Sequence, residues 1–272
     1  MVSSHNRPAH HMLIDTHAHL DFPEFEGEID AILARAEQAG VTRIITIGTG
    51  VESSRRAVEL AERHPQLYAA VGIHPGAALE EPADAVAALR PLCASPRVVA
   101  IGEIGLDHYR LPATGGEALK AAQETLFRQQ LDLAAEHGLN AVIHQRGDCF
   151  EPAFRLLAPY LGQIRAVFHC FGGTPETASR VVEAGCLVSF TGIVTFKNAP
   201  LMQACAAAVP EGSYMIETDA PYLAPVPYRG QRCEPAHVRQ SAEKIAALRG
   251  QSLEQVATAT TAAAEAFFRL PH

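Results

Sequence analysis

The chain has 272 residues, of which 48% are hydrophobic and 19% are charged, a composition typical of a soluble globular protein with a substantial core. Its formal net charge of −8 argues against broad electrostatic capture of nucleic acid, so a polyanionic substrate would depend on local cations and metal. No apolar run approaches the ~18 residues that span a bilayer, and the six cysteines form no Cys-x-x-Cys pair. We therefore expect a reduced, cytoplasmic, monomeric protein that does not bind membranes.

The chain opens with a polar, His-rich segment, MVSSHNRPAHH, which we expect to be a disordered extension or the remnant of a tag. The fold is predicted to occupy residues 12–272 as one domain. Eight short apolar runs follow, each with the length and the β-branched content typical of a buried parallel strand. These predicted strands cover residues 12–17, 43–49, 67–73, 98–104, 140–145, 165–170, 187–192 and 214–219.

Helical patterns separate the runs, and the clearest of them covers residues 117–137, which Gly138 ends. After the eighth strand the pattern predicts a helix over residues 235–249. A second helix follows, for which Ser252 and Gln255 supply a capping box. Eight strands that alternate with helices indicate an α/β fold, a (β/α)8 TIM barrel with an extra C-terminal helix.

The loops that follow the strands carry the active site in such a barrel. The two longest irregular loops, 107–116 and 220–233, both follow strands that end in side chains able to bind metal. We therefore predict that these two loops contact the substrate.

Side chains able to bind metal stand at the ends of five apolar runs. His17 and His19 lie two residues apart, so on a strand they point to the same face, roughly 6.5 Å apart. An isolated His-x-His pair is a weak signal, with ordinary core or surface histidines as the alternative. Candidates at four further strand ends argue against coincidence, because buried Asp, Glu and His need partners. The six candidate ligands are His17, His19, Glu103, His144, His169 and Asp219.

Six ligands exceed the four that one tetrahedral zinc ion requires. They suit two divalent ions about 3.5–4 Å apart that share a carboxylate, and Glu103, on the fourth strand, is the expected bridge. Mixed imidazole and carboxylate ligation favours zinc or manganese, while a carboxylate-rich half keeps magnesium open. Such a centre at one mouth is the arrangement expected of a metal-dependent hydrolase.

Several side chains near the same mouth are weaker candidates for substrate binding. His74 ends the third strand, and a structural role is an equally good interpretation of it. The loop arginines could clamp phosphates and the loop tyrosines could stack on unpaired bases, although each alone is often a solvated cation or a packed ring. The predicted substrate contacts are His74, Tyr109, Arg110, Arg146, Arg229 and Arg232, with Lys197, Tyr222 and Tyr228 as further candidates.

Four motifs along the chain resemble the signatures of TatD-type deoxyribonucleases, which belong to the wider amidohydrolase-like metal-dependent hydrolases. The motifs occur in the order of that family, and the resemblance covers nearly all of residues 12–270. They are DTHAH at 15–19, GEIGLD at 102–107, HCFGG at 169–173 and ETDAPYL at 217–223.

The resemblance implies a TIM barrel with metal-dependent DNase activity, including 3′→5′ exonuclease action on single strands. Two departures from the family pattern fall at the predicted substrate rim: HQRGD at 144–148 replaces the usual His-x-Arg-Asp/Glu-Ala, and Cys233 stands where Asn is usual before Glu-Pro. The resemblance also implies two ligand sets, one of His17, His19, Glu103 and Asp219 and one of Glu103, His144 and His169.

The predicted function is metal-assisted hydrolysis of phosphodiester bonds in DNA, with single-stranded ends as the substrate. Glu103 and Asp219 are the predicted catalytic residues; Asp219 would either accept the proton of the attacking water or serve as a ligand only. One alternative is an amide or ester hydrolase, including an aminoacyl-tRNA deacylase. Residues 98–106 contain no lysine for the carboxylated bridge that is common in that group, which argues against it. A non-catalytic, metal-stabilised barrel that binds a partner is the other alternative.

Overall fold

The computed structural model describes residues 12–82, 84–109 and 111–271. The N-terminal segment 1–11 and the predicted substrate contact Arg110 therefore lie outside the described residues. Eight parallel strands follow one another in chain order around one sheet, as predicted for a TIM barrel. The strands are β1 (Leu13–Ala18), β2 (Val41–Ile47), β3 (Leu67–Val71), β4 (Val98–Asp107), β5 (Asn140–Arg146), β6 (Ala166–Phe168), β7 (Leu187–Phe190) and β8 (Tyr214–Ile216).

Hydrogen bonds between the first strand and the segment after the last strand close the barrel. The amide of Asp219 donates to the carbonyl oxygen of His17 at 2.8 Å, and the amide of His19 donates to that of Ala220, also at 2.8 Å. The hydroxyl of Thr16 donates to the carbonyl oxygen of Ile216 at 3.1 Å. Residues from opposite ends of the chain thus become neighbours at the carboxyl ends of the strands.

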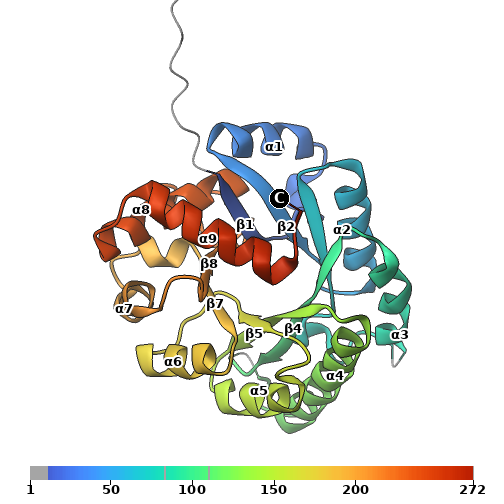
Figure 1. Ribbon diagram of the computed structural model, residues 1–272. Helices are drawn as coiled ribbons and strands as arrows, with labels where there is room; N and C mark the ends of the chain where they lie inside the picture. Colours follow the sequence, from blue (N-terminus) through green and yellow to red (C-terminus); the bar gives the residue numbers. More distant parts are fainter. Residues whose placement is uncertain (1–11, 83, 110, 272) are drawn as a thin grey trace, which may run out of the picture.

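Helices connect successive strands and surround the sheet (Figure 1). Both faces of each strand are therefore buried, which explains why the strands are apolar almost throughout. The helices are α1 (Ile29–Gln38), α2 (Val51–Arg63), α3 (Ala85–Leu89), α4 (Gly116–His137), α5 (Phe150–Leu157), α6 (Pro175–Glu183), α7 (Pro200–Ala208) and α8 (Val238–Arg249), and two short 3-10 helices, η1 (Pro23–Phe25) and η2 (Pro75–Ala77), follow β1 and β3.

The last helix, α9 (Leu253–Phe268), is the predicted extra helix, and it crosses the end of the barrel where the strands begin (Figure 1). Phe267 packs in one cluster with Met215 and other side chains from the inside of the barrel. The hydroxyl of Thr261 donates to the carbonyl oxygen of Met12 at 2.8 Å. The side-chain amide of Asn140 donates to the carbonyl oxygen of Phe267 at 2.5 Å. α9 therefore covers the end of the barrel opposite to the carboxyl ends of the strands.

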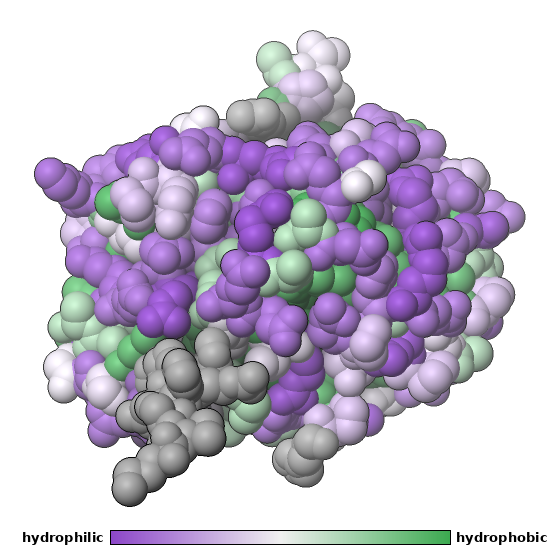
Figure 2. Space-filling model, turned by 90° about the horizontal axis from the view of Figure 1, so that it is seen from above, coloured by the Kyte–Doolittle hydropathy of each residue, from purple (hydrophilic) through white to green (hydrophobic). Residues whose placement is uncertain are grey.

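The surface of the protein is mainly polar. The face on the α1 side of the molecule is largely hydrophilic, and its hydrophobic residues gather near the centre (Figure 2). Among the residues that the structure describes, no helix combines the length and the apolar character needed to cross a membrane.

Candidate metal centre

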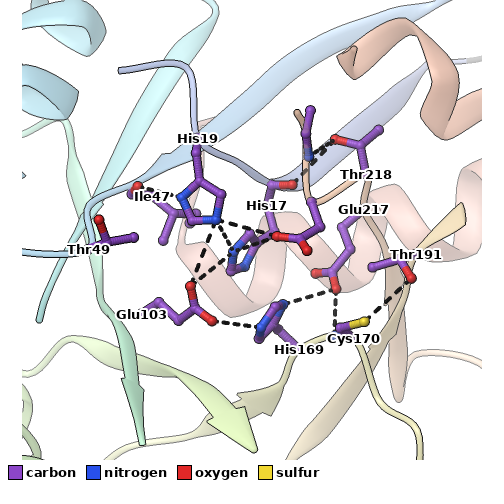
Figure 3. A network of polar contacts seen from close by, with 12 residues as sticks. His17, His19, Ile47, Thr49, Glu103, His169, Cys170, Thr191, Glu217 and Thr218 are labelled. Carbon is purple, nitrogen blue, oxygen red and sulfur yellow. Dashed lines mark hydrogen bonds and ion pairs between the residues drawn. The ribbon is translucent and has the colours of Figure 1, made fainter. Parts of the chain in front are cut away.

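The barrel brings the six predicted ligands to one site at the carboxyl ends of its strands, and Figure 3 shows four of them, His17, His19, Glu103 and His169, facing one another. Three of them lie within strands, and three lie one to three residues beyond a strand end. Parallel strands that end at one mouth place side chains from distant parts of the sequence side by side. The six are His17 and His19 from β1, Glu103 from β4, His144 from β5, His169 directly after β6 and Asp219 after β8.

One half of the site joins the first and last strands. The Nε2 atoms of His17 and His19 lie 3.3 Å apart. The Oδ1 atom of Asp219 lies 3.6 Å from Nε2 of His17 and 3.4 Å from that of His19. Asp219 adopts the left-handed conformation, with φ of 61°, which Asp tolerates better than most residues other than glycine. The three side chains together form a compact set of two imidazoles and one carboxylate.

Glu103 faces the two halves of the site with different oxygens (Figure 3). Its Oε2 atom lies 3.6 Å from Nε2 of His17 and 3.8 Å from Nε2 of His19. Its Oε1 atom lies 2.5 Å from Nδ1 of His144 and 2.8 Å from Nε2 of His169. A carboxylate in this position has the geometry of a bridge between two ligand sets.

The close approach of β4 to β5 depends on a glycine two residues after Glu103. Gly105 has a φ of 139°, and a Cβ atom there would collide with the carbonyl oxygen of His144. Only glycine fits this position, because it has no Cβ atom to collide and adopts a positive φ at little cost. The sequence Glu-x-Gly thus lets the carboxylate of β4 lie directly beside the imidazole of β5.

Neighbouring oxygen atoms face the outer nitrogens of two of the imidazole rings. Nδ1 of His19 lies 3.0 Å from the carbonyl oxygen of Ile47, which leaves Nε2 directed into the site. Nδ1 of His169 lies 3.4 Å from Oε1 of Glu217. Glu217 is itself held by the hydroxyl of Ser189, which donates to it at 2.7 Å. Outer partners of this kind fix the tautomer and the ring orientation of histidines that bind metal.

Asp15 ties together the backbone segments that carry His17 and Asp219. Its buried carboxylate accepts hydrogen bonds from the amide of Thr218 at 2.9 Å, from the hydroxyl of Thr218 at 2.6 Å and from the amide of His17 at 3.3 Å. Burial raises the pKa of Asp15 to about 8, although the hydrogen bonds from Thr218 oppose the shift. Asp15 therefore acts as a structural link between β1 and the segment after β8.

The charge balance of the site suits a divalent cation. Burial tends to raise the pKa of Glu103, but His169 and His144 outweigh it and hold the pKa well below its usual range. The pKa of Asp219 is also lowered. Burial tends to raise it, but the hydrogen bond from His19 and the charge of His17 outweigh burial. Among the described residues, every ion pair of these two carboxylates is with a histidine. Ionised carboxylates among imidazoles form a donor set that fits zinc, manganese or a related divalent metal.

The sequence predictions omit two residues of the site, Asp107 and Glu217. Oδ2 of Asp107 lies 3.4 Å from Nε2 of His144, and with His74 the two residues form a further group of potential ligands. Asp107 lies four residues beyond Glu103, on the same face of β4, so the two-residue period of a strand could have identified it. The role of Glu217 depends on its pairing with neighbouring strands, for which the sequence carries no local signal.

His74 is one predicted substrate contact that lies within the site. Its Nε2 atom is 3.9 Å from Oε1 of Glu103. Its Nδ1 atom accepts a hydrogen bond from the amide of Gly76 at 2.9 Å, so in the neutral ring the hydrogen is on Nε2. Burial lowers the pKa of His74 to about 4, and the ring is therefore neutral near pH 7. His74 thus directs an N–H group, rather than a lone pair, toward Glu103.

The other predicted contacts have different surroundings. The guanidinium group of Arg146 lies over the exposed ring of Tyr109, 4.4 Å from its centroid, and the amide of Tyr109 donates to Asp107 at 2.8 Å. These two side chains therefore lie together beside the ligand strands β4 and β5. Arg229 lies over the ring of Phe196, 4.0 Å from its centroid.

Arg232 is held by acidic partners away from the six ligands. Its guanidinium group lies 2.9 Å from Oε2 of Glu28 and 3.1 Å from Oε1 of Glu234. It also lies over the ring of Phe25, 5.1 Å from the centroid. These contacts favour a structural role, in which Arg232 links the loop after β8 to the start of α1.

Comparison with known proteins identifies the family. The family model described as TatD related DNase matches residues 14–269. The chain is 36% identical over 260 residues to an uncharacterized metal-dependent hydrolase, YabD, of Bacillus subtilis. The match covers 95% of this chain and all of the relative. It is also 36% identical over 262 residues to the 3′-5′ ssDNA/RNA exonuclease TatD of Citrobacter rodentium, covering 94% and 97% of the two chains.

A solved structure agrees with this assignment. The TatD homologue YjjV of Escherichia coli is 31% identical, superposes with a TM-score of 0.88, and the match covers 95% of this chain and 98% of the other. The predicted resemblance and the predicted barrel are both confirmed. The chain therefore belongs to the TatD family of metal-dependent hydrolases.

Proposed function

We propose that the protein hydrolyses phosphodiester bonds of nucleic acid and acts as a 3′→5′ exonuclease on single strands. The observation that carries this proposal is the position of Glu103, whose two oxygens face two separate sets of imidazoles. A shared carboxylate between two ligand sets is typical of enzymes that use two metal ions on phosphate esters. The relative from Citrobacter rodentium, named as a 3′-5′ ssDNA/RNA exonuclease, supports the choice of substrate.

The ligands divide into two sets in this proposal. His17, His19 and Asp219 would hold one divalent ion, His144 and His169 would hold the second, and Glu103 would bind both. Zinc, manganese and magnesium are the candidate metals. Such a pair supplies positive charge to the phosphoryl oxygens and makes a bound water a stronger nucleophile near neutral pH.

Two residues of the chain would handle protons and charge during the reaction. Asp219 is ionised and only partly buried at the mouth, so it can accept the proton of the attacking water. His74 directs its Nε2–H group into the same site and can donate a hydrogen bond to a phosphoryl oxygen as negative charge develops there. His74 is thus proposed as a hydrogen-bond donor, with Asp219 as ligand and base.

Substrate contacts outside the metal centre are proposed for Tyr109, Arg146 and Arg229. Arg146 and Tyr109 stack on each other beside the second ligand set, where a guanidinium group and a ring can meet a phosphate and a base. We do not include Arg232, because two glutamates already neutralise its guanidinium group. Such a small number of cations on a protein of net charge −8 suits a few phosphates near one end of a strand.

The test is hydrolysis of single-stranded DNA and RNA by protein stripped of metal and then resupplied with magnesium, manganese or zinc. We expect release of mononucleotides from the 3′ end with at least one of these metals, and no release by the stripped protein or by Glu103→Ala. Strands labelled at the 5′ end would show a ladder of shortened products. Hydrolysis of ester or amide substrates without any hydrolysis of nucleic acid would contradict the proposal.

A further inference from the structure

Two aromatic side chains form a pair directly beside the metal centre. The ring of Phe22 stacks on that of His19, with centroids 4.7 Å apart and planes 17° apart. Tyr222 approaches Phe22 edge to face, with centroids 6.3 Å apart and planes 75° apart. We call Phe22 and Tyr222 the aromatic corner. It contacts a proposed ligand directly, because Phe22 stacks on His19, whose Nε2 atom lies 3.4 Å from Oδ1 of Asp219.

The aromatic corner is accessible from solvent. Tyr222 is 50% exposed, and among the described residues only Tyr109 and Tyr222 are exposed aromatic side chains. Phe22 is partly exposed. The exposed ring of Tyr222 therefore offers an apolar face to a planar group that enters from solvent.

The backbone fixes the corner relative to the ligands. The amide of Tyr222 donates to the carbonyl oxygen of Asp219 at 2.9 Å, and the amide of Phe22 donates to that of His19 at 3.2 Å. Each ring therefore belongs to a tight turn that starts at a proposed ligand. A planar group bound at the corner would lie at a defined distance from the carboxylates.

We propose that the aromatic corner binds the base of a nucleotide next to the scissile phosphate, with the face of the base stacked on the exposed ring of Tyr222 and its edge toward Phe22. This inference rests on the proposed function and adds that the enzyme requires an unpaired base at this position. Every nucleobase has an apolar, polarisable face, so a stacking site is tolerant of sequence. A paired base is covered by its neighbours in the duplex, so its face is not available to the ring of Tyr222.

The test compares equilibrium binding of single strands that carry one abasic nucleotide at each of the last three positions from the 3′ end. Strands with phosphorothioate linkages, which resist hydrolysis, are used with metal-loaded protein, and binding is followed by fluorescence anisotropy. At one of these positions, loss of the base should weaken binding to the wild type about tenfold. Tyr222→Ala should bind the intact strand about tenfold more weakly and should no longer distinguish it from that abasic strand.

Two further variants separate stacking from other effects. Tyr222→Phe should behave as the wild type, because it keeps the ring and removes only the hydroxyl. Phe22→Leu should reduce discrimination less than Tyr222→Ala does, because it leaves the stacking ring of Tyr222 in place. Leu201→Ala, which removes an exposed apolar side chain on α7, is the matched control and should bind every strand as the wild type does.

Each outcome has one meaning. If Tyr222→Ala keeps the same preference for the intact strand as the wild type, the aromatic corner does not bind a base, although the enzyme can still hydrolyse nucleic acid. If the wild type binds and hydrolyses no strand with any of the three metals, the proposed function fails and the inference fails with it. Equal binding of all abasic strands by the wild type would also overturn the inference.

Discussion

At the scale of single residues, the position of Glu103 has the largest consequence. Its two oxygens lie within 4 Å of five imidazoles: Oε2 faces His17 and His19, and Oε1 faces His144, His169 and His74. We expect Glu103→Ala to lower the occupancy of both metal sites, because a bridge contributes a bond to each ion. Metal content by elemental analysis should fall from about two equivalents to below one. The exposed Glu24, changed to Ala, is a matched control that should keep full occupancy. Loss of a single ion, with the other still tightly bound, would contradict the bridging assignment.

His74 offers a second test at this scale, because its tautomer is set by the amide of Gly76. His74→Ala should lower kcat/KM by about tenfold, the loss of one hydrogen bond to a charged group. His74→Gln should retain most activity, because the amide nitrogen of Gln replaces the Nε2–H donor. Both variants should keep the metal content of the wild type, as should the surface control His137→Ala. A fall in metal content in His74→Ala would instead identify His74 as a ligand.

The sequence could predict that these six side chains share one site, because each stands at the end of an apolar run. A buried strand has few reasons to end in His, Asp or Glu unless these side chains meet partners. Glu217 was not predicted, because its neighbours Ser189 and His169 reach it only through the pairing of β6, β7 and β8. The engagement of Arg232 by Glu28 likewise depends on a contact between residues that are 204 positions apart in the chain.

At the scale of elements, strand order and helix positions followed from the alternation of apolar runs and helical patterns. The predicted helix 117–137 agrees with α4, and the capping box of Ser252 and Gln255 starts α9 as expected. The strands β6 and β8 are shorter than predicted, because the chain leaves the sheet before His169 and Asp219 so that their side chains can turn into the mouth. The packing of α9 across the barrel could not be predicted, since it depends on the shape of the closed sheet.

The role of α9 leads to a prediction about stability. Phe267 is fully buried between α9 and the interior side chains of the barrel. Phe267→Ala should lower the free energy of unfolding by about 3–5 kcal/mol, from lost burial and the cavity left behind. Urea denaturation followed by circular dichroism would measure the change. Leu201→Ala, at an exposed position, should stay within about 0.5 kcal/mol of the wild type.

The same variant also tests whether the packing of α9 at one end of the barrel affects the candidate ligands at the other end. The six candidate ligands lie at the carboxyl ends of the strands, and α9 lies at the opposite end. Folded Phe267→Ala should therefore keep its metal content and its KM for single strands. A variant that lost metal while remaining folded would show that the packing of α9 controls the geometry of the ligands.

At the scale of the whole molecule, the net charge of −8 restricts how nucleic acid can be held. An acidic protein repels a long polyanion, so attraction must come from metal and from the few cations at the mouth, such as Arg146. α9 closes the opposite end of the barrel, so a strand cannot pass through it. These features together favour the capture of one end of a strand, with only two or three phosphates in contact.

The salt dependence of strand binding reports how many phosphates the protein neutralises. For single strands the logarithm of the binding constant falls with the logarithm of salt concentration, with a slope of about −0.7 for each neutralised phosphate. We expect a slope of roughly −1.5 to −2 between 50 and 200 mM salt, measured with a hydrolysis-resistant strand and metal-loaded protein. Arg146→Ala should make the slope shallower, whereas Arg232→Ala should leave it unchanged because glutamates already neutralise that side chain. A slope near −5 would indicate an extended cationic track. Cleavage of covalently closed circular duplex as fast as of linear single strands would show that no free end is needed. Either result would refute capture by the end.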